Sequence, residues 1–310
     1  MLNQVLVPLD GSRLAEAALS PAAYLAQKLG AEVMLVHIIE RDAPQAIHGE
    51  RHLADPEETY AYLNEVAHSA FPNELHVKEH VHTSQTADVA QGIVDHAAEL
   101  GSDLIVMCTH GQSGLRDLLF GSIAQQVVAL GTIPVLLVRP RGIGRQQPFT
   151  CRKLLVPLDG MPGHEQGLGM AVELAHACAA ELHLLLVVPT LSTLSGSRAA
   201  AGRFLPVATT QVLELSQQEA EDYLHRHTSQ LQAQGVLAKA EIGRGEEVAK
   251  IIDEARKTGA ELIVMGTHGK AGIDAFWSGS IAPKVSSRSR LPLLLVPITK
   301  TELNQEISNE

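Results

Sequence analysis

The apolar positions of this chain fall into two alternating patterns. Short runs such as "VLVPL" (5–9) and "PVLLV" (134–138) are apolar throughout, which is typical of parallel strands that helices cover on both faces. Between them, apolar residues recur at helical spacing, as at 15, 18, 19, 22, 25, 26 and 29. The run "LHVKEHVH" (75–82) alternates instead, which predicts a more exposed edge strand. Alternating strands and helices predict doubly wound α/β domains, each with a five-stranded parallel sheet flanked by helices.

The whole pattern occurs twice. "VLVPLDGS" (5–12) matches "LLVPLDGM" (154–161), and "SDLIVMCTHG" (102–111) matches "AELIVMGTHG" (260–269). Copies of this length are domains rather than the shorter units of a solenoid. The second copy carries a net insertion around 189–211, a stretch rich in small residues that predicts a loop. We therefore expect domains at 1–141 and 152–299, a linker at 142–151 and a polar tail at 300–310.

The last strand of each copy has no charge to protect it as a sheet edge. "IPVLLVRP" (133–140) and "LPLLLVPI" (291–298) are both apolar runs, and an uncovered apolar edge promotes unwanted pairing. We therefore predict that the two strands cover one another across a pseudo-two-fold axis, which would make the chain a dimer within itself.

Composition narrows the classes of partner. The formal net charge is −11 and no run of Lys or Arg occurs, which argues against nucleic acid as a partner. No apolar run approaches the ~20 residues that cross a membrane. The N-terminus lacks the pattern of a signal peptide, and the cysteines at 108, 151 and 178 have no disulfide or metal spacing. These features predict a cytoplasmic protein.

A glycine-rich stretch follows the fourth predicted strand of each copy. It reads "MGTHGKAGIDAFWSGSIAPKV" at 265–285 and "MCTHGQSGLRDLLFGSIAQQV" at 107–127. In open α/β sheets, ligands bind outside the carboxyl ends of the strands. Ser280 is a predicted N-cap, so the amides of Ile281 and Ala282 would face that crevice as an anion site. The stretch therefore predicts a loop that wraps phosphate groups.

These residues resemble a known family. The spacing G266-x2-G269-x9-G279-S280, with "VPLD" after the first strand, resembles the ATP-binding pattern of universal stress proteins, and two copies resemble the family's tandem members. The resemblance implies ATP as ligand, together with Mg²⁺. It implies that Asp159 and Asp10 contact the ribose or a phosphate-bound metal, with Asp159 as the candidate for the metal. It also implies that four residues lie beside the adenine: Val187 and Met265 in the second copy, and Ile38 and Met107 in the first. The implied phosphate-loop positions are Gly269, Gly279, Ser280 and Ile281, and in the first copy Gly111, Gly121, Ser122 and Ile123. The remaining candidate residues of the two sites are Pro157, Leu158, Gly266, Ala282 and Pro8.

The function that this resemblance implies is a stress-response nucleotide sensor with little or no turnover. We assign no catalytic residue, because the sequence offers no placed general base and no cationic clamp for a transferred phosphate. Two alternatives stay open: a scaffold that works through protein contacts without nucleotide, and a slow ATPase. The protein partner is unidentified, and a homodimer of whole chains is left open.

Each candidate residue also has a structural alternative. The glycines could form turns in a site that has lost its ligand, and Asp10 and Asp159 could cap the helices that follow them. His110 and His268 have no nucleophile or acid partner at useful spacing, which favours a turn-stabilising role.

Two further histidine groups suggest a metal. His76, His80 and His82 would share one face of the predicted edge strand, and His225 and His227 lie close together in the sequence. The strand face is polar, so a solvated surface role is favoured.

The first copy departs from the nucleotide pattern at Cys108, where the second copy has Gly266. A side chain at this position would intrude on the backbone that approaches the ligand. We therefore predict that the second site binds ATP more tightly. For the thiol itself, a buried and inert role is favoured over redox sensing.

Overall fold

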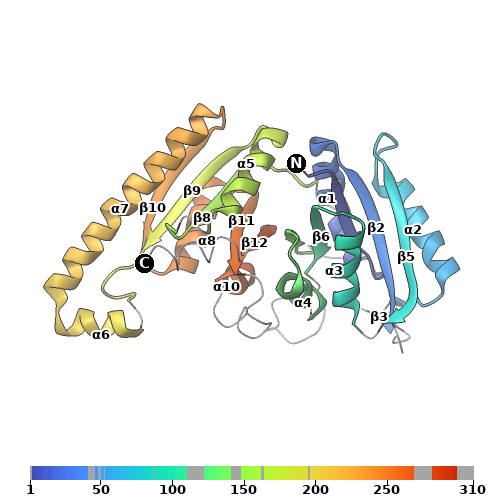
Figure 1. Ribbon diagram of the computed structural model, residues 1–310, viewed down its shortest axis with the longest axis horizontal. Helices are drawn as coiled ribbons and strands as arrows, with labels where there is room; N and C mark the ends of the chain where they lie inside the picture. Colours follow the sequence, from blue (N-terminus) through green and yellow to red (C-terminus); the bar gives the residue numbers. More distant parts are fainter. Residues whose placement is uncertain are drawn as a thin grey trace.

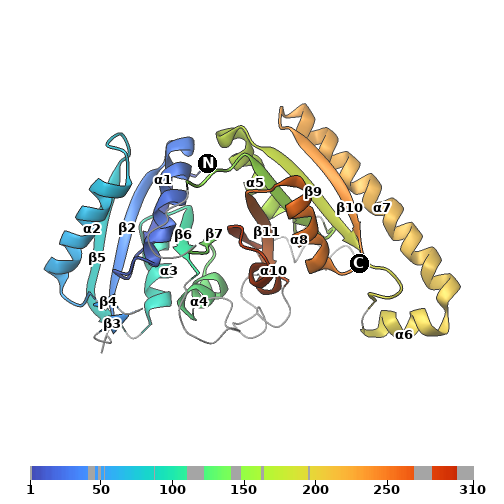
Figure 2. The ribbon, with the colours of Figure 1, turned by 180° about the vertical axis from the view of Figure 1, so that it is seen from behind.

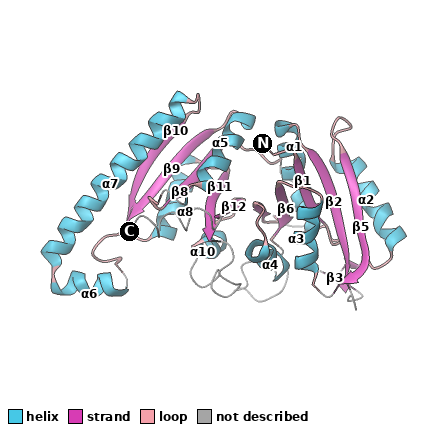
Figure 3. Ribbon diagram, in the orientation of Figure 1, coloured by secondary structure: helices cyan, strands magenta, loops and turns pink. Residues whose placement is uncertain are grey.

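The ten principal strands form one continuous sheet in a computed structural model (Figures 1 and 3). The structure describes residues 2–40, 46–47, 50–51, 53–86, 88–109, 122–140, 148–161, 164–194, 196–268 and 281–298. The strand order is β10-β9-β8-β11-β12-β7-β6-β1-β2-β5. The first half contributes β1 (Gln4–Pro8), β2 (Glu32–Glu40), β5 (Val77–Thr86), β6 (Leu104–Cys108) and β7 (Val135–Val138). The second contributes β8 (Lys153–Leu158), β9 (Glu181–Val188), β10 (Ala238–Arg244), β11 (Leu262–His268) and β12 (Leu293–Ile298).

Each half has the strand order third, second, first, fourth, fifth, and its strands pair in parallel. This confirms the doubly wound α/β fold with two repeated five-stranded sheets. The outer strand β5 pairs with β2 alone among the described residues, so the alternating run at 75–82 does lie at a sheet edge.

Helices cover both faces of the sheet, as strands that are apolar on both sides require. One apolar layer lies under α1 (Leu19–Leu29), α2 (Pro56–Ala70), α5 (Gln166–Cys178) and α7 (Pro206–Ala233). The other lies under α3 (Val89–Glu99), α4 (Ser122–Leu130), α8 (Glu247–Thr258) and α10 (Ala282–Arg288), and Figure 2 shows the molecule from behind. The smaller elements are η1 (Ala15–Ala18), β3 (Ala46–Ile47), β4 (Glu50–Arg51) and α6 (Gly196–Phe204). Among the described helices, none is both long and apolar enough to cross a lipid bilayer.

The two halves join through their last strands. β7 and β12 are antiparallel, with Leu136 opposite Leu294. Leu294 has the same place in the second copy that Leu136 has in the first, so the pseudo-two-fold axis passes through this pair. The predicted pairing of the last strands is therefore confirmed, and both leucines are buried at its centre.

The insertion in the second half is helical, so the loop predicted at 189–211 is wrong. Helix α6 occupies Gly196–Phe204, and α7 begins at Pro206 and runs along the outside of β10 (Figure 1). Proline suits the first turn of a helix, where its missing N–H would have no helical partner. The residues before it include three consecutive alanines, which favour helix.

The described end of the linker packs against the first half. The backbone N–H of Phe149 donates to Ser20 Oγ at 3.3 Å, and its ring meets that of Tyr24 edge to face. Cys151 is fully buried, and its thiol is hydrogen-bonded to that of Cys178 at the end of α5. The structure thus brings together two of the cysteines that are far apart in the sequence, both as free thiols. The exact domain bounds stay a prediction.

Candidate functional site

Each half has a point where the strand order reverses, between its first and fourth strands. There β1 pairs with β6, and β8 pairs with β11. In open α/β sheets, ligands bind at such a point, outside the carboxyl ends of the strands. The loops that carry Asp10 and Asp159 begin at these ends.

Both aspartates stabilise the turn in which they lie. Asp10 Oδ1 accepts hydrogen bonds from the Ser12 N–H at 2.9 Å and from Ser12 Oγ at 2.6 Å. Asp159 Oδ1 accepts from the Met161 N–H at 2.9 Å, and its other carboxylate oxygen pairs with Nδ1 of His164. These are short side-chain-to-backbone turns of the kind that Asp favours.

Neither aspartate is the N-cap of the helix that follows. That position belongs to Leu14 before η1 and to Glu165 before α5. Between each aspartate and its partner lies a glycine with positive φ: +87° at Gly11 and +82° at Gly160. The helix-cap alternative is therefore wrong, and a turn role replaces it.

The residues predicted on the adenine side belong to one apolar layer. It is the layer under α3, α4, α8 and α10, and Figure 2 shows the helices that cover it. The adenine-side residues in this layer are Ile38 and Met107 in the first half and Val187 and Met265 in the second. Ile123, Ile281 and Ala282, which were predicted at the phosphate end of the sites, pack in the same layer. Pro8 and Pro157 are half-buried at the strand ends, and Leu158 packs against the opposite layer.

Most of the predicted phosphate loop lies outside the described residues. This holds for Gly111, Gly121, Gly269, Gly279, Ser280 and also His110. Of the flanking positions, Ser122 is the exposed first residue of α4. Helix α10 begins at Ala282, and its N-cap position is Ile281, not Ser280 as expected. Pro283 lies in its first turn, where it leaves no helical hydrogen bond unmade.

Gly266 is explained by close packing of α5. A Cβ on Gly266 would lie 3.1 Å from the carbonyl oxygen of His164, and a Cβ on Gly167 would lie 2.8 Å from the Gly266 nitrogen. The pair of glycines lets the start of α5 contact the end of β11. The first half has Ala18 and Cys108 at these two places, and there a 3-10 turn precedes the helix.

The Cys108 side chain is buried, and burial with a smaller contribution from Asp10 raises the pKa of its thiol to about 12. The thiol is therefore protonated at neutral pH, which supports the inert role over redox sensing. By the alternation of strand β6, it lies on the opposite sheet face from Met107. The suggestion that it obstructs the ligand stays untested.

The first half has a contact that the sequence did not predict. His37 is buried, and its ring nitrogens meet the carbonyl oxygens of Leu9 at 2.8 Å and Leu53 at 3.0 Å. Leu53 also packs on the turn after β1, where a Cβ on Gly11 would lie 2.8 Å from Leu53 Cδ1. The only sequence signal is a histidine inside the apolar run of β2. In the second half Leu186 takes the place of His37.

Comparisons with known proteins agree with this class of tandem doubly wound protein. The model of the universal stress protein family matches residues 1–139 and again residues 150–297. Universal stress protein YxiE of Bacillus subtilis is 32% identical over 148 residues, which are 46% of this chain and 97% of that protein. A universal stress protein of Mycolicibacterium smegmatis is 23% identical over 305 residues, or 94% of this chain and 96% of its own.

Solved structures share the fold over the whole chain. The protein PA1789 of Pseudomonas aeruginosa PAO1 aligns with a TM-score of 0.70 at 17% identity, covering 100% of this chain and 98% of its own. A universal stress protein from Archaeoglobus fulgidus aligns with a TM-score of 0.61 at 16% identity, covering 96% of this chain and 97% of its own. Because the family model matches both halves, the chain belongs to the universal stress protein family, as a tandem member.

Proposed function

We propose that this universal stress protein binds ATP with Mg²⁺ at the carboxyl ends of the strands in each half, and acts as a cytoplasmic nucleotide sensor with little or no turnover. The observation that carries the proposal is the pairing of the first and fourth strands. Because β8 pairs with β11, the loop with Asp159 begins beside the strand that ends after Met265 and Gly266. The family's ATP-binding pattern falls on these same elements.

The roles of the second-half residues follow from their chemistry. Val187 and Met265 offer apolar surface to the adenine ring. The Asp159 side chain is 48% exposed, so its carboxylate is accessible to a ribose hydroxyl or to nucleotide-bound Mg²⁺. Mg²⁺ is commonly bound through one or two carboxylates together with substrate phosphates. Gly269, Gly279 and Ser280 would bring backbone N–H groups to those phosphates, with the amides of Ile281 and Ala282 behind them.

Calorimetric titration of MgATP into the full chain tests the proposal. We expect Gly279→Asp to abolish binding at the second site, because it adds a Cβ and a negative charge to an anion pocket. The matched control is Gly169→Asp, which adds the same charge on α5 where a new Cβ meets no atom within 4 Å. Undiminished total binding in a folded Gly279→Asp variant would place the ligand elsewhere.

The second candidate function is a scaffold that works through protein contacts. Exposed apolar side chains on α6, on α7 and between the two helices favour it: Phe204, Leu205, Val207, Val212 and Leu215. Exposed apolar surface often contacts other proteins. The two candidates are distinguished by purifying the protein without added nucleotide and then denaturing it. Adenine nucleotide should be released if the protein binds ATP, but not if it is a scaffold that works without nucleotide. Phosphate release with added Mg²⁺ measures any slow ATPase activity, and sedimentation shows whether whole chains form a homodimer.

A further inference from the structure

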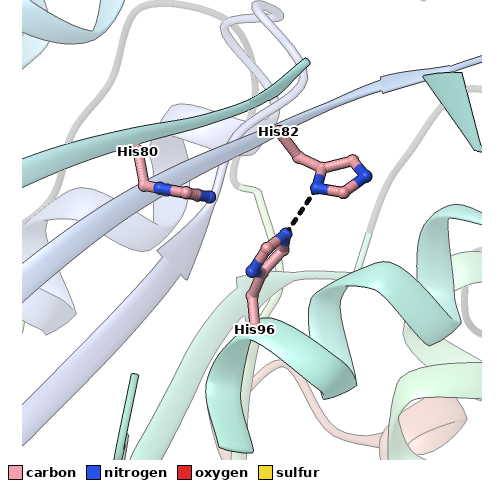
Figure 4. Close-up of side chains that lie close together, drawn as sticks. All are labelled: His80, His82 and His96. Carbon is pink, nitrogen blue, oxygen red and sulfur yellow. Dashed lines mark hydrogen bonds between the residues drawn. The ribbon is translucent and has the colours of Figure 1, made fainter. Parts of the chain in front are cut away.

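Three imidazole rings meet at the outer edge of the first half. His80 and His82 are two residues apart on β5, so they share one face of the strand. His96 comes from α3, which covers that face (Figure 4). Its ring centroid lies 4.6 Å from that of His80 and 4.7 Å from that of His82. One nitrogen of each ring lies within 4.8 Å of one nitrogen of each other ring.

These histidines are less exposed than the sequence suggested. His96 is buried, and His80 and His82 are half-buried, whereas His76 is exposed and lies just before the strand. The expectation of a solvated face therefore fails for His80 and His82. Tertiary packing explains the difference, because α3 covers this part of β5 and contributes the third ring, that of His96.

The nitrogen atoms are arranged as metal ligands would be. Nε2 of His80 is buried and has no hydrogen-bond partner, an arrangement that is costly for a polar atom. Nε2 of His96 lies 2.8 Å from Nδ1 of His82. On its other side, Nδ1 of His96 lies 3.3 Å from the Glu99 carboxylate. A carboxylate behind a histidine is the usual outer partner of a metal-binding imidazole, since it fixes the proton on the far nitrogen.

The second half has a cation at the equivalent place. There Glu241, Gly243, Glu254 and Lys257 replace His80, His82, His96 and Glu99 by strand register and helix position. Nζ of Lys257 lies 3.3 Å from a carboxylate oxygen of Glu241 and 3.3 Å from one of Glu254. The same junction of strand and helix thus holds a lysine ammonium group in the second half and three imidazole rings in the first.

We propose that His80, His82 and His96 bind a divalent transition metal ion, Zn²⁺ in the first place, with one coordination position left open. Neutral imidazole suits Zn²⁺, Cu²⁺ and Ni²⁺, and three-histidine Zn²⁺ sites keep a fourth position for water or a ligand. None of its three ligands is a residue of the proposed nucleotide site.

The distances permit coordination after small side-chain rotations. Zn–N bonds of about 2.0–2.1 Å place two ligands of a tetrahedron roughly 3.3 Å apart. The contact between His82 and His96 would open by about half an ångström to admit the ion, a shift that χ rotation supplies. Neutral imidazole is the form that ligates metal.

Calorimetric titration of Zn²⁺ into the chelator-treated full chain tests the proposal. We expect one tight site per chain in the wild type. Glu99→Gln should lower the Zn²⁺ affinity by roughly 10- to 100-fold, as is typical when an outer partner of a ligand is lost. His80→Gln and His96→Gln each remove a ligand, so each should lower the affinity by more than that. The matched controls are His76→Gln and His225→Gln, which remove exposed imidazoles outside the cluster and should leave the tight site unchanged.

Folding of each variant is checked by circular dichroism and thermal unfolding. A second measurement guards against a misfolded variant: Zn²⁺ should raise the unfolding temperature of the wild type and of His76→Gln, but not that of His80→Gln. Absence of a tight wild-type site would overturn the proposal. So would a tight site that survives in folded His80→Gln, because the ions would then bind other histidines of the chain.

Discussion

The two halves of this protein share one strand order but differ where the outermost strand meets the next helix. In the first half His80, His82 and His96 meet there, and in the second Lys257 joins Glu241 and Glu254. At both junctions most of these side chains are only partly covered, and His96 alone among them is buried. The comparison teaches that packing at the sheet centre fixes the fold, while the edge is free to hold different chemistry.

A second difference lies at the candidate nucleotide crevice. The turn after β1 is covered by Leu53 and joined to β2 by His37, and Ser12 within it is fully buried. The corresponding turn after β8 exposes Met161, and its Asp159 pairs with His164. Among the described residues, Leu53 packs on the first-half turn, whereas only Leu186 comes within 4 Å of a Cβ built on Gly160, so the two turns are held differently.

The largest expected effect tests the symmetry between the halves. Leu136 and Leu294 are opposite one another and fully buried, so Leu136→Ala and Leu294→Ala should each lower the free energy of unfolding by about 2–5 kcal/mol. Because the two side chains share one contact, the double variant should lose less than the sum. Denaturant unfolding measures all three. If the two single variants lost clearly different amounts of unfolding free energy, the two halves would be symmetric in structure but not in stability.

A smaller effect tests the close approach that is specific to the second half. Gly167→Ala places a Cβ 2.8 Å from the Gly266 nitrogen, and such overpacking should destabilise by about 1–3 kcal/mol. Gly169→Ala on the same helix meets no atom within 4 Å and should stabilise by about 0.5–1 kcal/mol. Thermal unfolding compares them. Equal behaviour of the two variants would mean that α5 moves away from β11 without cost.

A comparable effect is expected on ligand affinity. We predict that the second site binds ATP about 10- to 100-fold more tightly than the first, a difference of roughly 1.4–2.7 kcal/mol. Gly121→Asp and Gly279→Asp in the full chain each leave one site, and titration gives its affinity. Cys108→Gly then isolates the contribution of the thiol. Equal affinities of the two single-site variants would contradict the ranking, and no gain from Cys108→Gly would exclude the thiol as its cause.

The smallest effect concerns the ionic junction of the second half. Hydrogen bonds to Glu254 and Glu241 raise the pKa of Lys257 above its ordinary value of 10.5. A raised pKa contributes stability below the unfolded value that is lost as pH rises through the folded one. Lys257→Met should therefore be slightly less stable than wild type at pH 7, and the gap should narrow above about pH 10.5. Denaturant unfolding at both pH values measures the gap, and a gap that grows with pH would contradict the assignment.

Local sequence patterns determined much of the fold of this protein. Fully apolar runs identified buried parallel strands, and helical spacing identified the helices between them. The repeated sequence motifs identified two halves with the same order of elements. The apolar, uncharged runs at 133–140 and 291–298 even predicted which strands would pair across the axis, because an apolar edge must be covered. The resemblance in the glycine spacing pointed to the family that the comparisons confirm.

Tertiary structure alone decided the features that join distant segments. The alternating pattern placed His80 and His82 on one face, but only the packing of α3 brings His96 to them and covers them. Likewise, the folding of the second half brings Cys151, just before β8, to Cys178 at the end of α5, and Gly266 is required by the approach of α5. The physical reason is common to all three. Periodicity and turn chemistry act between neighbours in the chain, whereas a site formed by two elements depends on how closely they pack.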